Sequence, residues 1–357
     1  MSMGPSTEFF DGSTYITSDY SGIPEVCELP DSSFRKIFQP LVFAVVFVLG
    51  MMGNILILVI YILYRKVKSM TDVFLVNLAM ADLLWLLTAP FNAMYAVNQW
   101  VLGVFICKIF RSLYSINFFS GVLFLTCISI ERYIVIVQAT SALKLRSATF
   151  LFSKIATVVV WVVSIILSIP VMIYSRVERI DEENICQMIF DDSSMVVNLG
   201  MQIAQVFVGF VLPSTIMVFC YSIIMGTLLK SRTFKKHKAL WVIVALIGMF
   251  FVLQMPYSIF LFLKAVGSKS MPCAEKITRM NVEYVTESLA FIRSCLNPVL
   301  YAFVGVKFRN DILLVLKDIH CISALRYQER YQSHRSKSSK RFSFMSSGTD
   351  SSSLFQL

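Results

Sequence analysis

The sequence predicts an all-α membrane protein: a bundle of seven transmembrane helices, followed by a short amphipathic helix on the cytoplasmic side. Its 357 residues are 57% hydrophobic and only 15% charged, and the mean hydropathy of the chain is +0.71. Soluble proteins carry about 25% charged residues, so this chain is far more apolar than they are. Seven separate apolar stretches divide it, and only helices can satisfy the backbone of such stretches inside hydrocarbon.

Each apolar stretch is long enough to cross a bilayer. The hydrocarbon core is roughly 30 Å thick, and a helix of about 20 mostly apolar residues spans it. The stretches lie at residues 38–64, 72–97, 105–137, 151–174, 196–229, 238–267 and 280–304. Together they form one transmembrane domain over residues 38–304, in which no inverted repeat of the kind found in many transporters is visible.

The charges are distributed unevenly along the chain. Residues 1–34 contain six acidic residues and no Lys or Arg, whereas Lys and Arg gather in the loops after the first, third and fifth stretches. Loops rich in Lys and Arg stay on the cytoplasmic side of a membrane. We therefore expect a multi-pass plasma-membrane protein with an extracellular acidic arm, residues 1–37, and a cytoplasmic C-terminus. The net charge of +10 then reflects topology and does not indicate nucleic-acid binding.

Two segments follow the last apolar stretch. Residues 305–320 place Phe308 and Ile312 largely on one face, a pattern typical of an amphipathic helix that contacts membrane lipid. Cys321, directly after this helix, is a candidate for palmitoylation. Residues 321–357 form a Ser-rich regulatory tail, where phosphorylation would add negative charge.

Four of the eight cysteines fall on the extracellular side of this topology, where disulfides persist. These four are Cys27, Cys107, Cys186 and Cys273. Four cysteines allow three connectivities, and the residues alone do not choose among them.

Polar residues inside the apolar stretches are few, and such residues mark either function or contacts between helices. The notable ones are Asn54, Asp82, Asn117, Glu131, Arg132, Gln254, Glu287, Arg293 and Asn297. For an isolated asparagine such as Asn54 or Asn117, a bridge to a neighbouring helix is the favoured interpretation. Asp82 differs from them, because an ionised carboxylate in hydrocarbon needs a partner.

Several short motifs lie in order along the seven stretches. They are Gly53-Asn54, Asn77-Leu78-Ala79-Met80-Ala81-Asp82-Leu83, Glu131-Arg132-Tyr133, Trp161, Pro213, Tyr221, Pro256 and Asn297-Pro298-Val299-Leu300-Tyr301. This set resembles the rhodopsin-like G-protein-coupled receptors over roughly residues 40–320. The resemblance implies the same seven-helix fold and a signalling function.

The resemblance also implies a switch at the cytoplasmic end. In these receptors the Arg of the third helix is held by its neighbouring acid in the inactive state and released toward the G protein in the active state. An acid–base pair at the rim of a bundle is a bistable element of the kind that a switch requires. The positions of this sequence that match the switch motifs are Glu131, Arg132, Tyr133, Tyr221, Asn297, Pro298 and Tyr301.

A second set of motifs narrows the resemblance. It consists of Thr88-Ala89-Pro90, Gln99-Trp100-Val101-Leu102-Gly103, Gln254-Met255-Pro256-Tyr257, Val285-Thr286-Glu287-Ser288-Leu289-Ala290 and an acidic arm with its own Cys27. These motifs resemble the chemokine receptors of the CC type. Further motifs, such as Gly305-Val306-Lys307-Phe308-Arg309-Asn310, are most similar to the type-six receptor, with types seven and nine nearby. The chemokine-receptor resemblance implies two disulfides, Cys107–Cys186 and Cys27–Cys273, each expected to contribute a few kcal/mol.

The ligand implied by this resemblance is a CC chemokine, a small basic protein. Glu287 resembles the family's anchor for the basic N-terminus of the ligand, and Tyr114 and Tyr257 are expected beside it. An ordinary pair between Glu287 and a neighbouring helix is the alternative. The acidic arm would raise the association rate of a basic ligand. Its residues expected to contact the ligand are Tyr15, Asp19 and Tyr20, with Tyr20 a candidate for sulfation.

The chain departs from the chemokine-receptor pattern at two positions that matter. Asn92 follows Pro90-Phe91 where relatives usually have Trp, so we expect a more polar ligand pocket there. Arg293 stands one helical turn before Asn297, where relatives usually carry His. A guanidinium at this depth needs a carboxylate, and Asp82 is the obvious candidate. We hypothesise that an ion pair between Arg293 and Asp82 replaces the sodium ion that many rhodopsin-like receptors bind at this depth.

These observations predict a receptor that binds a CC chemokine outside the cell and activates an inhibitory G protein, leading to calcium mobilisation and chemotaxis. No cofactor or metal is expected, and an enzyme is disfavoured because the three histidines, His237, His320 and His334, all lie at or beyond the cytoplasmic boundary. A channel or transporter is expected to show repeated halves or a continuous polar path, and neither is visible in the sequence. The closer alternative is an atypical chemokine receptor that scavenges its ligand without G-protein coupling.

Overall fold

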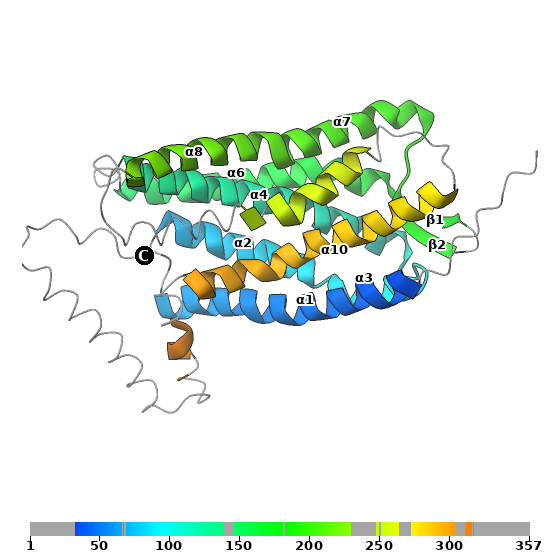
Figure 1. Ribbon diagram of the computed structural model, residues 1–357, viewed down its shortest axis with the longest axis horizontal. Helices are drawn as coiled ribbons and strands as arrows, with labels where there is room; N and C mark the ends of the chain where they lie inside the picture. The colour runs from blue at the N-terminus through cyan, green and yellow to red at the C-terminus, as the bar shows by residue number, and fades with distance from the viewer. Residues whose placement is uncertain are drawn as a thin grey trace, which may run out of the picture.

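Long helices run side by side in the computed structural model, with a two-stranded sheet at one end (Figure 1). We call this end the hairpin end and the opposite one the Arg132 end. The structure describes residues 33–65, 67, 69–138, 146–180, 183–229, 248–249, 251–263, 273–304, 311–315 and 317.

Five helical segments of the described residues are long and apolar enough to cross a membrane. They are Lys36–Tyr64, Met70–Val97, Gly103–Val137, Leu151–Tyr174 and Met195–Thr227. Of the sixth predicted stretch, an apolar helix is described at Phe251–Leu263. The seventh forms α10, Cys273–Val304, which has the length to cross but carries six charged residues along its 32. The predicted stretches therefore correspond to helices wherever the structure describes them.

Two predicted stretches are interrupted in the structure. The stretch 72–97 divides into α2, Met70–Leu86, and α3, Ala89–Val97, where Pro90 stands at the start of α3. Proline is well placed there, because the N–H groups of the first turn have no acceptor within the helix, so the lack of an N–H in proline costs no hydrogen bond. The stretch 196–229 divides into α7, Met195–Val206, and α8, Leu212–Leu229, with a π-helical turn between them.

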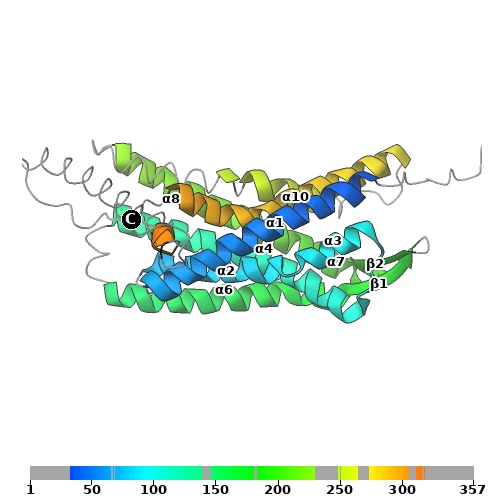
Figure 2. The ribbon, with the colours of Figure 1, turned by 90° about the horizontal axis from the view of Figure 1, so that it is seen from below.

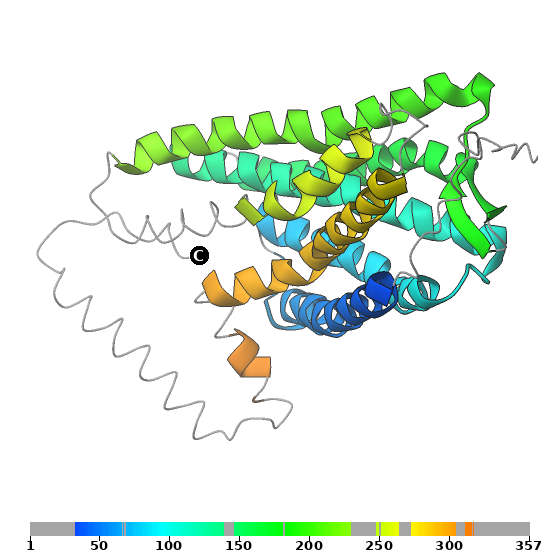
Figure 3. The same ribbon diagram turned by 45° about the vertical axis from the view of Figure 1, so that its right-hand side comes forward.

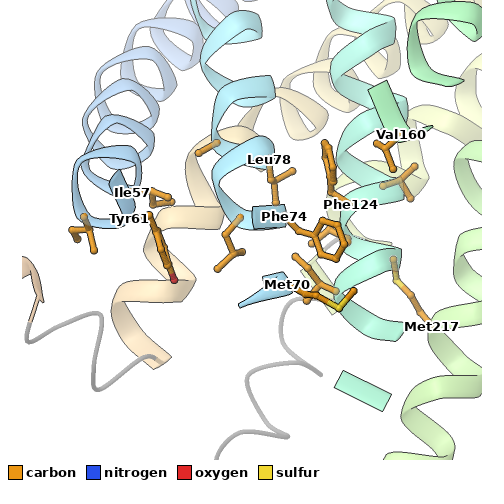
Figure 4. Packing of buried hydrophobic residues seen from close by; sticks show 14 of the residues in the cluster. Ile57, Tyr61, Met70, Phe74, Leu78, Phe124, Val160 and Met217 are labelled. Carbon is orange, nitrogen blue, oxygen red and sulfur yellow. The ribbon is translucent and has the colours of Figure 1, made fainter. Parts of the chain in front are cut away.

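The central part of the bundle is packed around α4, Gly103–Val137, which contacts α2, α8 and also α6, Arg146–Tyr174. Figure 4 shows side chains of one buried cluster meeting between these helices: Phe74 from α2, Phe124 from α4, Val160 from α6 and Met217 from α8. Phe74 and Phe124 are fully buried. Burial of such side chains excludes lipid and leaves a close-packed interior.

The helix α1, Ser33–Val59, packs along α10, and the two lie on the side of the bundle away from α6 (Figure 2). Gly53 makes this approach possible: a Cβ there would lie 2.6 Å from the Cβ of Pro298 in α10. Small residues let membrane helices come close, and polar side chains then join them. Asn54 does so, because its Nδ2 donates to the carbonyl oxygens of Gly50 and Ser294, both at 2.9 Å. The predicted bridging role of Asn54 is confirmed.

Two antiparallel strands, β1, Ser175–Ile180, and β2, Glu183–Met188, form a hairpin beyond the end of α6 (Figure 3). A disulfide joins Cys107, in the second turn of α4, to Cys186 of β2, which confirms the pair expected from the resemblance. Trp100 packs against this disulfide, donates from Nε1 to the Gly103 carbonyl at 2.9 Å and from its backbone N–H to the Asn184 carbonyl at 2.8 Å. The Gln99 to Gly103 motif therefore attaches the hairpin to the start of α4.

Part of the predicted amphipathic helix at 305–320 is described. Residues 311–315 and 317 are helical, and Val315 is buried in the cluster that contains Ile57 and Tyr61. The helix as a whole stays a prediction, as does the tail at 321–357. Of the arm predicted at 1–37, residues 33–37 form the start of α1, and the remainder lies outside the described residues.

We expect loss of the Cys107–Cys186 disulfide to destabilise the receptor. The bond closes a segment of 79 residues, and a disulfide over a long segment typically contributes about 2–4 kcal/mol. The Cys107→Ser/Cys186→Ser variant should therefore unfold at a lower temperature in detergent. Cys127→Ser, which changes a free cysteine of the same helix, is the control, and an equal shift in both variants would contradict the prediction.

Candidate functional site

A chain of aromatic rings crosses the bundle toward the hairpin end. Neighbouring ring centroids are 4.8 Å apart for Phe43 and Phe291, 5.3 Å for Phe291 and Trp85, 5.1 Å for Trp85 and Tyr114, and 5.7 Å for Tyr114 and Tyr257. All four pairs meet edge to face, the geometry that aromatic rings prefer. The rings come from five helical segments. Tyr114 and Tyr257 lie together, while the ligand cavity that they are expected to line stays a prediction.

Glu287 of α10 is half-buried near this end and accepts a hydrogen bond of 3.2 Å from Nε2 of Gln39 in α1. Gln39 is almost completely buried, with 4% of its surface exposed. The carboxamide is neutral and orients the carboxylate through this hydrogen bond. The contact between Glu287 and a neighbouring helix, which we gave as the alternative to ligand anchoring, is therefore present.

Asn92 and Arg111 are two further polar residues of this end. Asn92 is half-buried and donates from Nδ2 to the hydroxyl of Thr88 at 3.0 Å, one turn away in the chain. Arg111 of α4 donates from Nη2 to the Cys186 carbonyl at 3.3 Å, while its Nε is buried without a hydrogen-bond partner among the described residues. Our sequence reasoning did not single out Arg111, although a charge in an apolar stretch is the signal that marks such residues.

A second group of polar residues lies midway along the bundle. Asp82 of α2 is fully buried, and its two carboxylate oxygens accept hydrogen bonds from Nδ2 of Asn117 at 3.0 Å and from Nδ2 of Asn297 at 2.9 Å. Nη2 of Arg293 donates to Oδ1 of Asn117 at 2.6 Å. The four side chains form one network that joins α2, α4 and α10.

The direct ion pair that we predicted between Arg293 and Asp82 is wrong. Asn117 lies between them, and no direct contact of ion-pair length joins the two charged groups in the described structure. The physical reason is that a carboxamide has one donor end and one acceptor end, so it can face a carboxylate and a guanidinium at once. The predicted helix-bridging role of Asn117 is confirmed, and the need of Asp82 for a polar partner is met by two amides.

At the Arg132 end, Glu131 and Arg132 are adjacent residues of α4. Nε of Arg132 lies 3.4 Å from Oε2 of Glu131, and Nη2 of Arg132 donates to the hydroxyl of Thr71 in α2 at 3.1 Å. Both charged side chains are largely buried: Arg132 exposes 14% of its side-chain surface and Glu131 exposes 9%. The guanidinium is therefore held by its own helix and by the first turn of α2.

Two tyrosines of the same end connect α4 to α8. The hydroxyl of Tyr221 in α8 donates to Oγ of Ser129 in α4 at 3.0 Å. Tyr133 packs near Ile224, and its ring centroid lies 6.3 Å from that of Phe219. Pro298 lies within α10, where it contacts Gly53 of α1.

Several predicted site residues lie outside the described residues. They are Tyr15, Asp19, Tyr20, Cys27 and Cys321, together with the side chains of Cys273 and Tyr301. Their roles, including the Cys27–Cys273 disulfide, stay predictions. Within the described ranges, no group of three or more His, Cys, Asp or Glu side chains is placed to hold a metal ion.

Sequence reasoning missed three partners that the structure supplies: Gln39 for Glu287, Thr71 for Arg132 and Ser129 for Tyr221. Gln39 could have been found as an amide in an apolar stretch. The two hydroxyl residues carry no such signal, because Ser and Thr in helices commonly donate to their own backbone, as Thr126 does to the Val122 carbonyl at 2.8 Å.

Comparison with known proteins agrees with this geometry. Residues 53–301 match the family described as 7 transmembrane receptor (rhodopsin family). The chain is 41% identical to the C-C chemokine receptor type 7 of Homo sapiens, covering 86% of this chain and 82% of the relative. It is 37% identical to the C-C chemokine receptor type 6 of Mus musculus, over 90% of each chain. It is 39% identical to the C-C chemokine receptor type 9 of Mus musculus, covering 90% of this chain and 89% of the relative.

The three receptor types named by the resemblance are thus all similar to this chain, and their identities lie too close together to separate one type from the others. The aligned region includes both ends of the bundle and the buried network between them. This chain belongs to the rhodopsin family of seven-transmembrane receptors and, within that family, to the C-C chemokine receptors.

Proposed function

We propose that this chain is the receptor for a CC chemokine and signals through an inhibitory G protein to calcium mobilisation and chemotaxis. The observation that carries the proposal is the Arg132 contact set, Glu131 at 3.4 Å and Thr71 at 3.1 Å, in a chain of the C-C chemokine receptor family. A guanidinium held at the rim by an acid and a hydroxyl can be released by a modest movement of either helix. This is the element that a ligand-operated switch needs.

The proposed ligand site is at the hairpin end, which we infer to be extracellular. Glu287 offers a half-buried carboxylate that Gln39 orients, and the rings of Tyr114 and Tyr257 lie in the same part of the bundle. A basic N-terminal segment of a chemokine fits this chemistry, because a carboxylate and a protonated amine form a charge-assisted hydrogen bond. The acidic arm, with Asp19 and Tyr20, would attract the basic body of the same ligand.

Arg111 adds a positive group to this end. Its Nε is buried without a partner among the described residues, so a ligand segment that supplies a carbonyl or carboxylate acceptor there would satisfy it. We therefore propose that the ligand site is bipolar, with Glu287 for a basic group and Arg111 for an acceptor.

On the cytoplasmic side, the proposed partners are the inhibitory G protein at the Arg132 end and arrestin and receptor kinases at the Ser-rich tail. The amphipathic segment at 305–320 would lie on membrane lipid. Release of Arg132 from Glu131 and Thr71, with inward movement of Tyr221, would open the surface for the G protein.

The ligand anchor can be tested with Glu287→Gln, which keeps the shape of the side chain and removes its charge. A hydrogen bond to a charged group is worth about 1.5–3 kcal/mol, so the chemokine concentration for half-maximal calcium flux should rise about 10- to 100-fold. A panel of CC chemokines applied to cells that express the chain identifies the ligand for this measurement. Glu275→Gln, an exposed residue at the start of the same helix, is the control, and equal potency in both variants would refute the anchor.

Thr71→Val tests the switch, because it removes the hydrogen bond to Arg132 with little change in volume. Loss of about 0.5–1.5 kcal/mol from the held state should raise ligand-independent activation of the inhibitory G protein about 2- to 10-fold, measured as a fall in cAMP. Thr126→Val is the control, since Thr126 is buried in α4 and donates to the Val122 carbonyl of its own helix. Unchanged basal activity in Thr71→Val would contradict this role.

Arg132→Ala separates signalling from scavenging. In a signalling receptor this variant should keep chemokine binding and lose the ligand-dependent fall in cAMP. If the unmodified chain already binds and internalises the chemokine with no change in cAMP, the receptor is of the atypical, scavenging kind, and the proposed coupling fails.

A further inference from the structure

Arg293 places a guanidinium where rhodopsin-like receptors often hold a sodium ion. We infer that this guanidinium is a built-in cation for Asp82, and that the receptor is consequently insensitive to sodium. Removing Arg293 should open a site for a monovalent cation. The inference does not depend on the identity of the ligand or of the G protein.

The burial of both groups supports this inference. Arg293 exposes 5% of its surface and Asp82 exposes none, so neither is solvated by bulk water. An isolated charge in a membrane-spanning bundle is strongly disfavoured, and opposite charges that share a hydrogen-bonded network stabilise each other. Asn117 transmits this interaction through contacts of 2.6 Å to Arg293 and 3.0 Å to Asp82.

The space for the guanidinium comes from a glycine. A Cβ on Gly121 of α4 would lie 2.6 Å from Nη1 and 3.2 Å from Cζ of Arg293. Any side chain at position 121 would therefore displace the guanidinium. Gly121 has no side chain at the point where the guanidinium of Arg293 lies on the facing helix. The packing of α4 against α10 therefore holds Arg293 in this place.

A sodium ion does not fit this arrangement. It would need oxygen ligands, but Oδ1 of Asn117, which lies beside Asp82, accepts from Arg293. Nε and Nη1 of Arg293 are buried donors with no partner among the residues described, and their positive ends would repel a cation.

The same residues would suit a cation once Arg293 is removed. Asp82 would then lack a compensating charge, Oδ1 of Asn117 would be free, and Oγ of Ser294 is a buried hydroxyl oxygen beside Asp82. Carboxylate, carboxamide and hydroxyl oxygens are the ligands that hard cations prefer.

The test measures unfolding temperature of the purified receptor in detergent, in sodium chloride and in choline chloride of equal concentration. For the unmodified chain we expect the same temperature in both salts. For Arg293→Ala, sodium at about ten times its dissociation constant should raise the temperature by roughly 2–4 °C over choline. A sodium-dependent rise in the unmodified chain, or none in Arg293→Ala, would overturn the inference.

Four further variants complete the test. Arg293→His and Arg293→Gln fill more of the space and serve if Arg293→Ala does not fold; each should gain the sodium response that the unmodified chain lacks. Asp82→Asn combined with Arg293→Ala should abolish that response, because it removes the carboxylate. Arg176→Ala, at an exposed position of β1, should behave like the unmodified chain in both salts.

A double-mutant cycle checks the position of the guanidinium independently. Gly121→Ala should lower the unfolding temperature in the unmodified chain, since its methyl group collides with Nη1, and should have a smaller effect in Arg293→Ala, where nothing is displaced. Additive effects of the two substitutions would show that the side chains do not meet.

Discussion

A carboxylate and a guanidinium buried midway along the bundle constrain the helices around them. Neither Asp82 nor Arg293 can be left without a polar partner in surroundings that exclude water, and Asn117 serves both. The helices α2, α4 and α10 must therefore keep their mutual register to within the reach of a hydrogen bond. By contrast, α1, α6 and α7 expose apolar side chains such as Ile166 to the surroundings, which suits a lipid-facing position.

One helix connects this network to both functional ends. From the hairpin end toward the Arg132 end, α10 carries Glu287, Arg293, Asn297 and Pro298 in that order. Asn297 donates to Asp82, and Pro298 lies against Gly53 of α1. Because a helix transmits displacement as a nearly rigid element, a movement of α10 at the proposed ligand site would change the buried network and the packing beyond it. The network thus lies between the proposed ligand site and the Arg132 end.

Much of this architecture could be predicted from the sequence, because lipid imposes a simple rule on the chain. Apolar stretches of sufficient length had to become helices, and their described parts did so. Features that depend on contacts between distant segments were not predictable in the same way. The strands β1 and β2, the break between α2 and α3 and the π-helical turn at Phe207–Val211 have no signal in hydropathy. The Arg293 network shows the same limit, since charge alone indicated a pair with Asp82 and not the intervening amide of Asn117.

The sequence by itself determined the number and length of the apolar stretches, the family resemblance and the residue types available for a switch. These follow from local composition and from the energetic need to satisfy backbone groups in lipid. Only the tertiary structure decided which side chains meet: Gln39 with Glu287, Thr71 with Arg132, Gly121 with Arg293. The physical reason is that hydrogen bonds and close contacts act over a few ångströms, so their partners depend on how separate helices rotate and pack, and a linear sequence does not contain that rotation.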